Sequence, residues 1–234
     1  MRSLYRLAVV LVVTILFTSF RANKNIHTIP PLKIMCIGDS ITQGGGVNDE
    51  YTYRLPLYNL LRKSGITVDY IGARTTGLRP DFVWPTGFDT DHESQYGATT
   101  EYIDEMIKKD LPGISSIPDI ALIDIGSNDE GKDPDRYVIP FLVDIIMKLR
   151  SINPSVKIFV AQIPGIRTNL KLHLDVFLMS IRYSSASSPI VTVPLYWGWN
   201  KERFTFDGSH PNTAGQEFIA QKFHKKILHV MRFH

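Results

Sequence analysis

The chain has 234 residues, of which 44% are hydrophobic and 21% charged, and this composition excludes a disordered or low-complexity protein. A single cysteine, Cys36, excludes an internal disulfide framework and a cysteine-rich zinc site. The net charge of +3 comes from the first 24 residues, because the remainder holds 22 basic and 23 acidic residues. Electrostatic attraction to nucleic acid or anionic lipid is therefore not expected of the body of the protein.

Residues 1–22 have the pattern of a secretion signal. Two arginines, Arg2 and Arg6, precede a mostly apolar stretch at 7–20, which is too short to span a bilayer comfortably. Phe20 is unfavourable for cleavage after Ala22, so an uncleaved signal anchor and, less favoured, a buried helix are alternatives. We expect export from the cytosol, by secretion or with a membrane tether, a linker at 23–31 and one globular domain at 32–234.

Strands and helices are predicted to alternate along the rest of the chain. In order, the pattern predicts a strand at 33–37, a helix at 53–64, a strand at 67–71, a helix at 99–110, a strand at 119–125, a helix at 134–152, a strand at 156–163, a helix at 169–183, a strand at 190–193 and a helix at 213–231. Residues 72–98 predict a long loop, a feature that often has a functional role. This α/β pattern favours a five-stranded parallel sheet with helices on both faces and ligands at the carboxyl ends of its strands.

The first of these strands is followed by GDSITQG at 38–44. Ser40 would lie on a tight turn between strand and helix, where its hydroxyl is exposed and the helix N-terminus favours developing negative charge. A plain turn with a capping residue is the alternative. A phosphate loop is disfavoured because no Gly-Lys-Ser/Thr ending follows, and the glycines come too late for a dinucleotide-binding fingerprint.

Two further polar motifs follow later strands. GSND at 126–129 offers the side-chain amide of Asn128 as a hydrogen-bond donor, and DGSHP at 207–211 places Asp207 three residues before His210. Each motif alone is more often an ordinary turn. Together, a nucleophile, an oxyanion donor and a base with its orienting acid at one edge of a sheet indicate acyl-transfer chemistry.

These three motifs resemble the signature blocks of the GDSL-type esterases, also called SGNH hydrolases, and the resemblance spans residues 33–228. The four name-giving residues fall on Ser40, Gly97, Asn128 and His210. The resemblance implies a three-layer, flavodoxin-like catalytic domain at 32–234 that needs no cofactor or metal. It further implies a Ser40 nucleophile, a His210 base oriented by Asp207, and an oxyanion hole formed by the N–H groups of Ser40 and Gly97 and the amide of Asn128. Glycine is expected at 97 because a side chain could block the approach of the backbone to the oxyanion.

Finer features are similar to carbohydrate esterase family 3, whose members remove acetyl groups from plant polysaccharides such as xylan. They are Tyr53-Arg54, VDYIG at 68–72 and Asp-His-Glu at 91–93. The chain departs from that pattern at Ser94, Tyr96 and Ser127, and the first two lie in the loop that is expected to line the substrate pocket. The candidate substrate-binding residues are Asp39, Tyr96, Trp197 and Trp199.

The sequence therefore predicts a monomeric serine esterase that hydrolyses O-acetyl esters on a carbohydrate such as acetylated xylan. A lysophospholipase or acyl-thioesterase of the same fold is the alternative, and a non-catalytic glycan-binding module is disfavoured by the intact catalytic residues. Asp89, Asp91, His92 and Glu93 could hold a cation, although salt bridges that organise the loop are the preferred interpretation.

Overall fold

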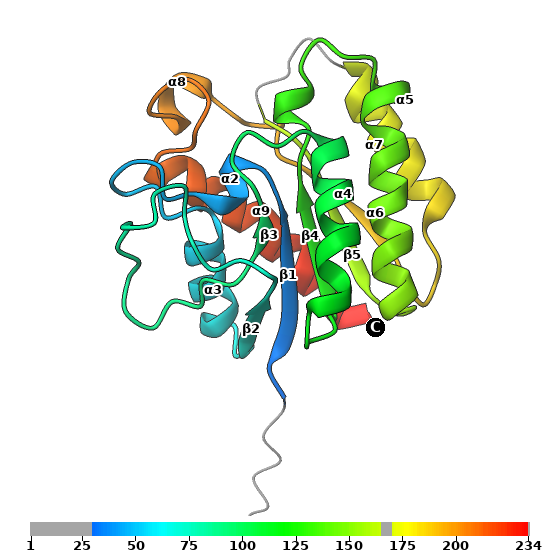
Figure 1. Ribbon diagram of the computed structural model, residues 1–234, viewed down its shortest axis with the longest axis horizontal. Helices are drawn as coiled ribbons and strands as arrows, with labels where there is room; N and C mark the ends of the chain where they lie inside the picture. The colour runs from blue at the N-terminus through cyan, green and yellow to red at the C-terminus, as the bar shows by residue number, and fades with distance from the viewer. Residues whose placement is uncertain (1–29, 165–169, 234) are drawn as a thin grey trace, which may run out of the picture. The chain divides into compact units, whose positions relative to one another are not determined.

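A parallel β-sheet forms the centre of the computed structural model, which describes residues 30–164 and 170–233 (Figure 1). Its strands are β1 (Leu32–Gly38), β2 (Val68–Ile71), β3 (Glu93–Ser94), β4 (Ile120–Asp124), β5 (Lys157–Gln162) and β6 (Ile190–Pro194). Their order is β2-β1-β4-β5-β6, every pair is parallel, and β3 also pairs with β1. The five predicted strands are confirmed, since each is observed within two residues of its expected bounds.

β3 is the strand that the sequence did not predict. β2 pairs with β1 only as far as Met35, and β3 pairs with Ile37 and Gly38, which lie further along β1. This two-residue strand draws one end of the long loop at 72–98 to the carboxyl end of β1.

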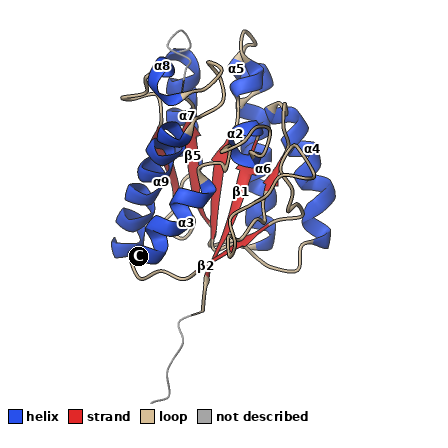
Figure 2. Cartoon of the chain, turned by 90° about the vertical axis from the view of Figure 1, so that its left-hand side faces the viewer, coloured by secondary structure: helices blue, strands red, loops and turns tan. Residues whose placement is uncertain are grey.

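Helices cover both faces of the sheet (Figure 2). They are α2 (Ser40–Gln43), α3 (Arg54–Lys63), α4 (Thr100–Asp110), α5 (Pro134–Tyr137), α6 (Ile139–Ile152), α7 (Leu170–Tyr183), α8 (Lys201–Phe204) and α9 (Thr213–Phe233). α3 and α9 pack together on one face, and α4 and α6 pack together on the other. β1 and β4 are almost wholly buried between these layers, which explains their continuous apolar sequences.

The helix expected at 134–152 is instead two helices, α5 and α6, separated at Val138. Pro140 lies in the first turn of α6, where its lack of an N–H is tolerated. In one continuous helix, the ring of Pro140 would clash with the carbonyl group of Arg136. The break therefore follows from this proline.

Arg54 connects the long loop to the segment that follows β1. Its side chain is fully buried, and it donates hydrogen bonds to the carbonyl oxygens of Thr42, Gln43, Thr90 and Asp91. The guanidinium also lies 5.7 Å from the ring centre of Trp84 and 5.5 Å from that of Phe88. One buried cation thus holds together two segments that are far apart in the sequence.

The predicted leader at 1–22 and most of the expected linker at 23–31 lie outside the described residues. Among the helices of 30–164 and 170–233, none combines the length and apolar character needed to cross a membrane.

Candidate active site

Ser40 lies directly after β1, at the start of α2. Gly38 makes the tight turn possible, because a Cβ at that position would lie 2.2 Å from the carbonyl oxygen of Asp124 and 2.3 Å from Oγ1 of Thr42. Asp39 caps α2 by accepting a hydrogen bond of 3.0 Å from the N–H of Ile41. Ser40 is 7% exposed, and its side chain lines a pocket at the carboxyl edge of the sheet.

His210 connects Ser40 to Asp207 through two hydrogen bonds. His210 Nδ1 lies 2.6 Å from Oδ2 of Asp207, and Nε2 lies 3.1 Å from Oγ of Ser40. An ionised Asp207 can only accept, so Nδ1 carries the proton and Nε2 can accept the proton of the serine hydroxyl. Ser40 and His210 are 170 positions apart in the sequence, and the fold brings them within hydrogen-bond distance.

The backbone around His210 holds Asp207 in place. Oδ1 of Asp207 accepts hydrogen bonds from the N–H groups of Ser209 (2.9 Å) and His210 (2.7 Å). Partial burial acts to raise the pKa of Asp207, but the bonds from His210 and the two N–H groups lower it below its ordinary value. Asp207 is therefore ionised near neutral pH, as a partner of a histidine base requires.

Asn128 is positioned by a hydrogen bond of its own side chain and by the bonds of the residue that follows it. Its Nδ2 donates a hydrogen bond of 2.9 Å to the carbonyl oxygen of Ala98, which leaves the second N–H of the amide available to a ligand. The next residue, Asp129, is buried and accepts two hydrogen bonds of 2.8 Å from the N–H and hydroxyl of Thr100, at the start of α4. Asn128 lines the same pocket as Ser40.

Gly97 adjoins the carbonyl group that Asn128 contacts. It has a φ of +75°, in the left-handed region, whereas a Cβ added to it would meet no protein atom within 4 Å. A side chain at this position would therefore not clash with the described protein, and its predicted obstruction of a bound oxyanion stays a prediction. The backbone conformation itself favours glycine.

The four candidate substrate-binding residues have different surroundings. Asp39 is fully buried, so in this structure its side chain is not available to a substrate and caps α2 instead. Tyr96 stacks on His210, with ring centres 5.0 Å apart. Trp199 is 8% exposed and packs against Phe218, although it reaches the pocket wall. Trp197 is 72% exposed and does not line this pocket.

Two buried carboxyl groups lie behind the serine. Burial raises the pKa of Asp39 to about 6, against the opposing effect of the bond from the Ile41 N–H. Burial also raises the pKa of Asp124 well above its ordinary value, and the charge of Asp39 adds to the rise. Within the described chain, Oδ2 of Asp39 and both carboxyl oxygens of Asp124 have no hydrogen-bond partner. The burial of these two carboxyl groups together was not predicted from the sequence.

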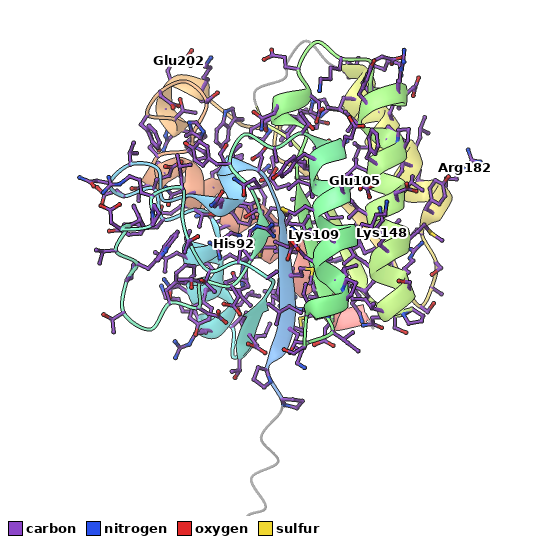
Figure 3. All side chains as sticks on the ribbon, viewed as in Figure 1. His92, Glu105, Lys109, Lys148, Arg182 and Glu202 are labelled. Carbon is purple, nitrogen blue, oxygen red and sulfur yellow. The ribbon has the colours of Figure 1, made fainter. Side chains whose placement is uncertain are left out.

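The acidic loop at 89–93 is held by protein contacts. His92, labelled in Figure 3, has partners at both ring nitrogens, since Nε2 bonds the carbonyl oxygen of Thr76 and Nδ1 bonds the hydroxyl of Ser94. Glu93 forms an ion pair of 2.6 Å with Arg74. In the residues that the structure describes, no three histidine, cysteine or carboxylate side chains could together hold a metal ion.

Several pocket residues were not identified from the sequence. They are Ile41, Glu130, Pro164, Lys201 and Thr205. Glu50, which contacts Tyr96, was also missed. These residues lie mainly in turns and irregular segments, where spacing carries no information about which side chains meet.

Comparison with known proteins identifies what this arrangement is similar to. A model described as the GDSL-like lipase/acylhydrolase family matches residues 36–218. A search of curated proteins gave no match.

Three solved structures are similar over most of the chain. An acetyl esterase mutant with an acetate ion has a TM-score of 0.72 at 25% identity, covering 86% of this chain and 98% of that one. A carbohydrate esterase family 3 protein from Talaromyces cellulolyticus has a TM-score of 0.73 at 25% identity, covering 87% and 99%. The family 3 carbohydrate esterase of Clostridium thermocellum has a TM-score of 0.71 at 26% identity, covering 87% and 98%.

Proposed function

The chain belongs to the GDSL-like lipase/acylhydrolase family and is a carboxylic ester hydrolase of SGNH type, and from this premise we propose that it removes O-acetyl groups from a carbohydrate by a Ser-His-Asp mechanism. The observation that most strongly supports the mechanism is the continuous hydrogen-bonded path from Asp207 through His210 to the hydroxyl of Ser40. Nothing else in the pocket offers a nucleophile together with a base in contact with it, within the described residues.

In the proposed reaction, His210 Nε2 takes the proton of Ser40 as Oγ attacks the acetyl carbonyl carbon. The resulting imidazolium is stabilised by Asp207, which also fixes the ring orientation. As the tetrahedral intermediate collapses, the bond between the acetyl carbon and the sugar oxygen breaks, His210 protonates that oxygen so that the sugar leaves as a free hydroxyl, and an acetyl-serine intermediate remains. A water molecule, deprotonated by His210, hydrolyses this intermediate and releases acetate.

We propose that the oxyanion of the tetrahedral intermediate accepts hydrogen bonds from the N–H groups of Ser40 and Gly97 and from the side-chain amide of Asn128. The bond from Asn128 to Ala98 supports this role, because it fixes the amide before substrate arrives.

The acetyl preference and the carbohydrate substrate are supported by the structural neighbours and by the pocket. The pocket has a volume of about 210 Å³, below the ~300–1,000 Å³ of typical small-molecule sites. Its rim includes Glu130 and Lys201, and polar groups of this kind suit a sugar better than a long acyl chain. We also propose that the N-terminal leader directs the protein out of the cytosol, where a polysaccharide would be met.

The experiment that tests this function compares hydrolysis of p-nitrophenyl acetate, butyrate and octanoate, together with acetate release from acetylated xylan. Ser40→Ala is the control for the nucleophile. Activity confined to acetyl substrates and abolished by Ser40→Ala is the expected result. Activity that is kept or increased toward octanoate would instead identify a lipid- or thioester-directed enzyme. Wild-type rates in Ser40→Ala would remove Ser40 from the mechanism.

A further inference from the structure

Two aromatic rings lie nearly parallel to the imidazole ring of His210. The ring of Tyr96 is 5.0 Å from it, centre to centre, with an angle of 25° between the planes. Phe206 lies 6.0 Å away at 18°. Phe206 is 43% exposed and belongs to the same loop as His210, so we expect it to restrict the imidazole ring less than Tyr96 does. Tyr96 comes from the distant segment that follows β3.

Tyr96 is held at both its backbone and its hydroxyl group. Its N–H donates a hydrogen bond of 2.6 Å to Oε1 of Gln43, which belongs to the same short helix as Ser40. Its hydroxyl lies 3.5 Å from Oε1 of Glu50 and can donate to it. The backbone of Tyr96 is therefore bonded to the helix that carries the nucleophile, and its hydroxyl group contacts a carboxylate.

Glu50 is a buried carboxylate that is held by backbone N–H groups. It is 2% exposed, and its Oε2 accepts hydrogen bonds from the N–H groups of Gly46 (2.6 Å) and Val47 (3.0 Å). A Cβ at Gly46 would lie 2.6 Å from that oxygen and 3.0 Å from the Tyr96 hydroxyl, so the turn fits closely around both groups. Burial raises the pKa of Glu50, while the two N–H groups and a charged His210 oppose the rise.

The carboxylate of Glu50 has no lysine or arginine within ion-pair distance among the described residues. A protonated His210 lowers the pKa of Glu50, whereas the charge of Asp207 raises it. A buried negative charge near a base favours the protonated form of that base, and the effect is stronger away from water.

We propose that Glu50 and Tyr96 act as a positioning pair for His210, the tyrosine ring fixing the plane of the imidazole and the carboxylate favouring the imidazolium that forms as Ser40 attacks. This inference rests on the proposed function, in which His210 is the general base. Neither residue touches the reacting atoms, so both act through His210. Tyr96 is then assigned to the base instead of to the substrate.

Other charged groups also face His210, and the test must separate them from Glu50. Asp207 bonds to Nδ1, the buried Asp39 interacts with the charge of His210, and Lys201 lines the same pocket. Glu50→Gln removes a charge and leaves the bonds among Asp207, His210 and Ser40 in place. A matched control exists at the preceding residue: Asp49→Asn removes an exposed carboxylate, and asparagine tolerates its φ of +65°.

The first measurement is the pH dependence of kcat/KM for p-nitrophenyl acetate. In Glu50→Gln the acid limb should move to lower pH by about half a pH unit, and kcat on the plateau should fall about 3-fold or more with KM unchanged. Asp49→Asn should match the wild type. A Glu50→Gln profile that superimposes on the wild type, or an equal shift in Asp49→Asn, would overturn the proposal.

Tyr96→Phe and Tyr96→Leu test the ring separately and remain informative if Glu50→Gln does not fold. The phenylalanine variant keeps the stacked ring, so its kcat should stay within about 3-fold of wild type, whereas the leucine variant should lose about 10-fold or more. Equal effects in the two variants, or a loss confined to KM, would contradict a positioning role.

A substrate-independent readout distinguishes this inference from the proposed function. The NMR signal of the His210 ring can be titrated in the wild type and in Glu50→Gln, with His210→Asn to assign it. The midpoint should move to lower pH in Glu50→Gln whatever the substrate is. An unmoved midpoint refutes the pair, and absence of any Ser40-dependent hydrolysis alongside a moved midpoint refutes only the proposed function.

Discussion

Replacing Asp39 with asparagine should change how the stability of the protein depends on pH. Burial raises the pKa of this carboxyl from 3.8 to about 6 in the folded state. Above pH 4 the unfolded chain releases the proton while the folded chain keeps it, so the free energy of unfolding falls as pH rises towards 6. A shift of about two units corresponds to a loss of about 3 kcal/mol, fully developed by pH 7.

Asparagine is a suitable probe because it cannot ionise and its side-chain oxygen can still accept from the Ile41 N–H at the N-cap of α2. Urea unfolding of the two proteins at pH 4.5, 5.5, 6.5 and 7.5 would give the free energy of unfolding at each pH. The advantage of Asp39→Asn over wild type should grow by about 2 kcal/mol across this range, because about 1 kcal/mol of the total is already lost at pH 4.5. Asp124, whose pKa is also raised by burial, has an effect of the same sign, and it is present in both proteins.

If the difference in free energy of unfolding between Asp39→Asn and wild type stayed constant with pH, this prediction would be refuted. That result would mean that the carboxyl ionises as easily in the folded protein as in the unfolded chain. Enzymatic activity, measured at the same pH values, separates this effect on stability from any effect on Ser40.

Three further substitutions test other parts of the structure. Asn128→Ala should lower kcat about 100-fold with little change in KM or Tm, measured with p-nitrophenyl acetate, because it removes one oxyanion donor; an unchanged kcat would exclude Asn128 from the oxyanion hole. Gly97→Ala should destabilise the protein by about 1–2 kcal/mol in urea unfolding, because its φ of +75° is unfavourable for alanine, although no atom lies within 4 Å of the new Cβ; equal stability would show that the loop relaxes at no cost. Arg54→Met should lower the free energy of unfolding by about 3 kcal/mol or more, since four carbonyl groups lose their donor, and a loss below 1 kcal/mol would contradict the connecting role described for this residue.

The fold could be predicted from the sequence because the strands and helices alternate with distinct periodicities. Parallel pairing then places the residues that follow β1 and β4 at one edge of the sheet, which is why Ser40 and Asn128 could be assigned together. The break at Val138 could also have been read from Pro140, had the helix been tested against the clash that a proline makes four residues back.

The rest of the site depends on geometry that spacing does not encode. Asp39 and Ser40 are neighbours in the chain, yet one side chain faces the core and the other the pocket, because a four-residue helix begins between them. Glu50 and Tyr96 are 46 positions apart in two irregular segments, so no periodicity in the sequence predicts that they meet. β3 is two residues long and too short to show any alternation.

The buried Arg54 has a consequence for how this enzyme could be redesigned. It joins the segment carrying Ser40 to the loop at 90–91, and it is not among the residues that line the pocket, whose rim includes Glu130 and Lys201. Rim residues can therefore be varied in a library without loosening the nucleophile. Changes to the long loop near Arg54 would instead make the serine turn less rigid. Selections for new substrates should therefore randomise the rim and keep that arginine and its carbonyl partners unchanged.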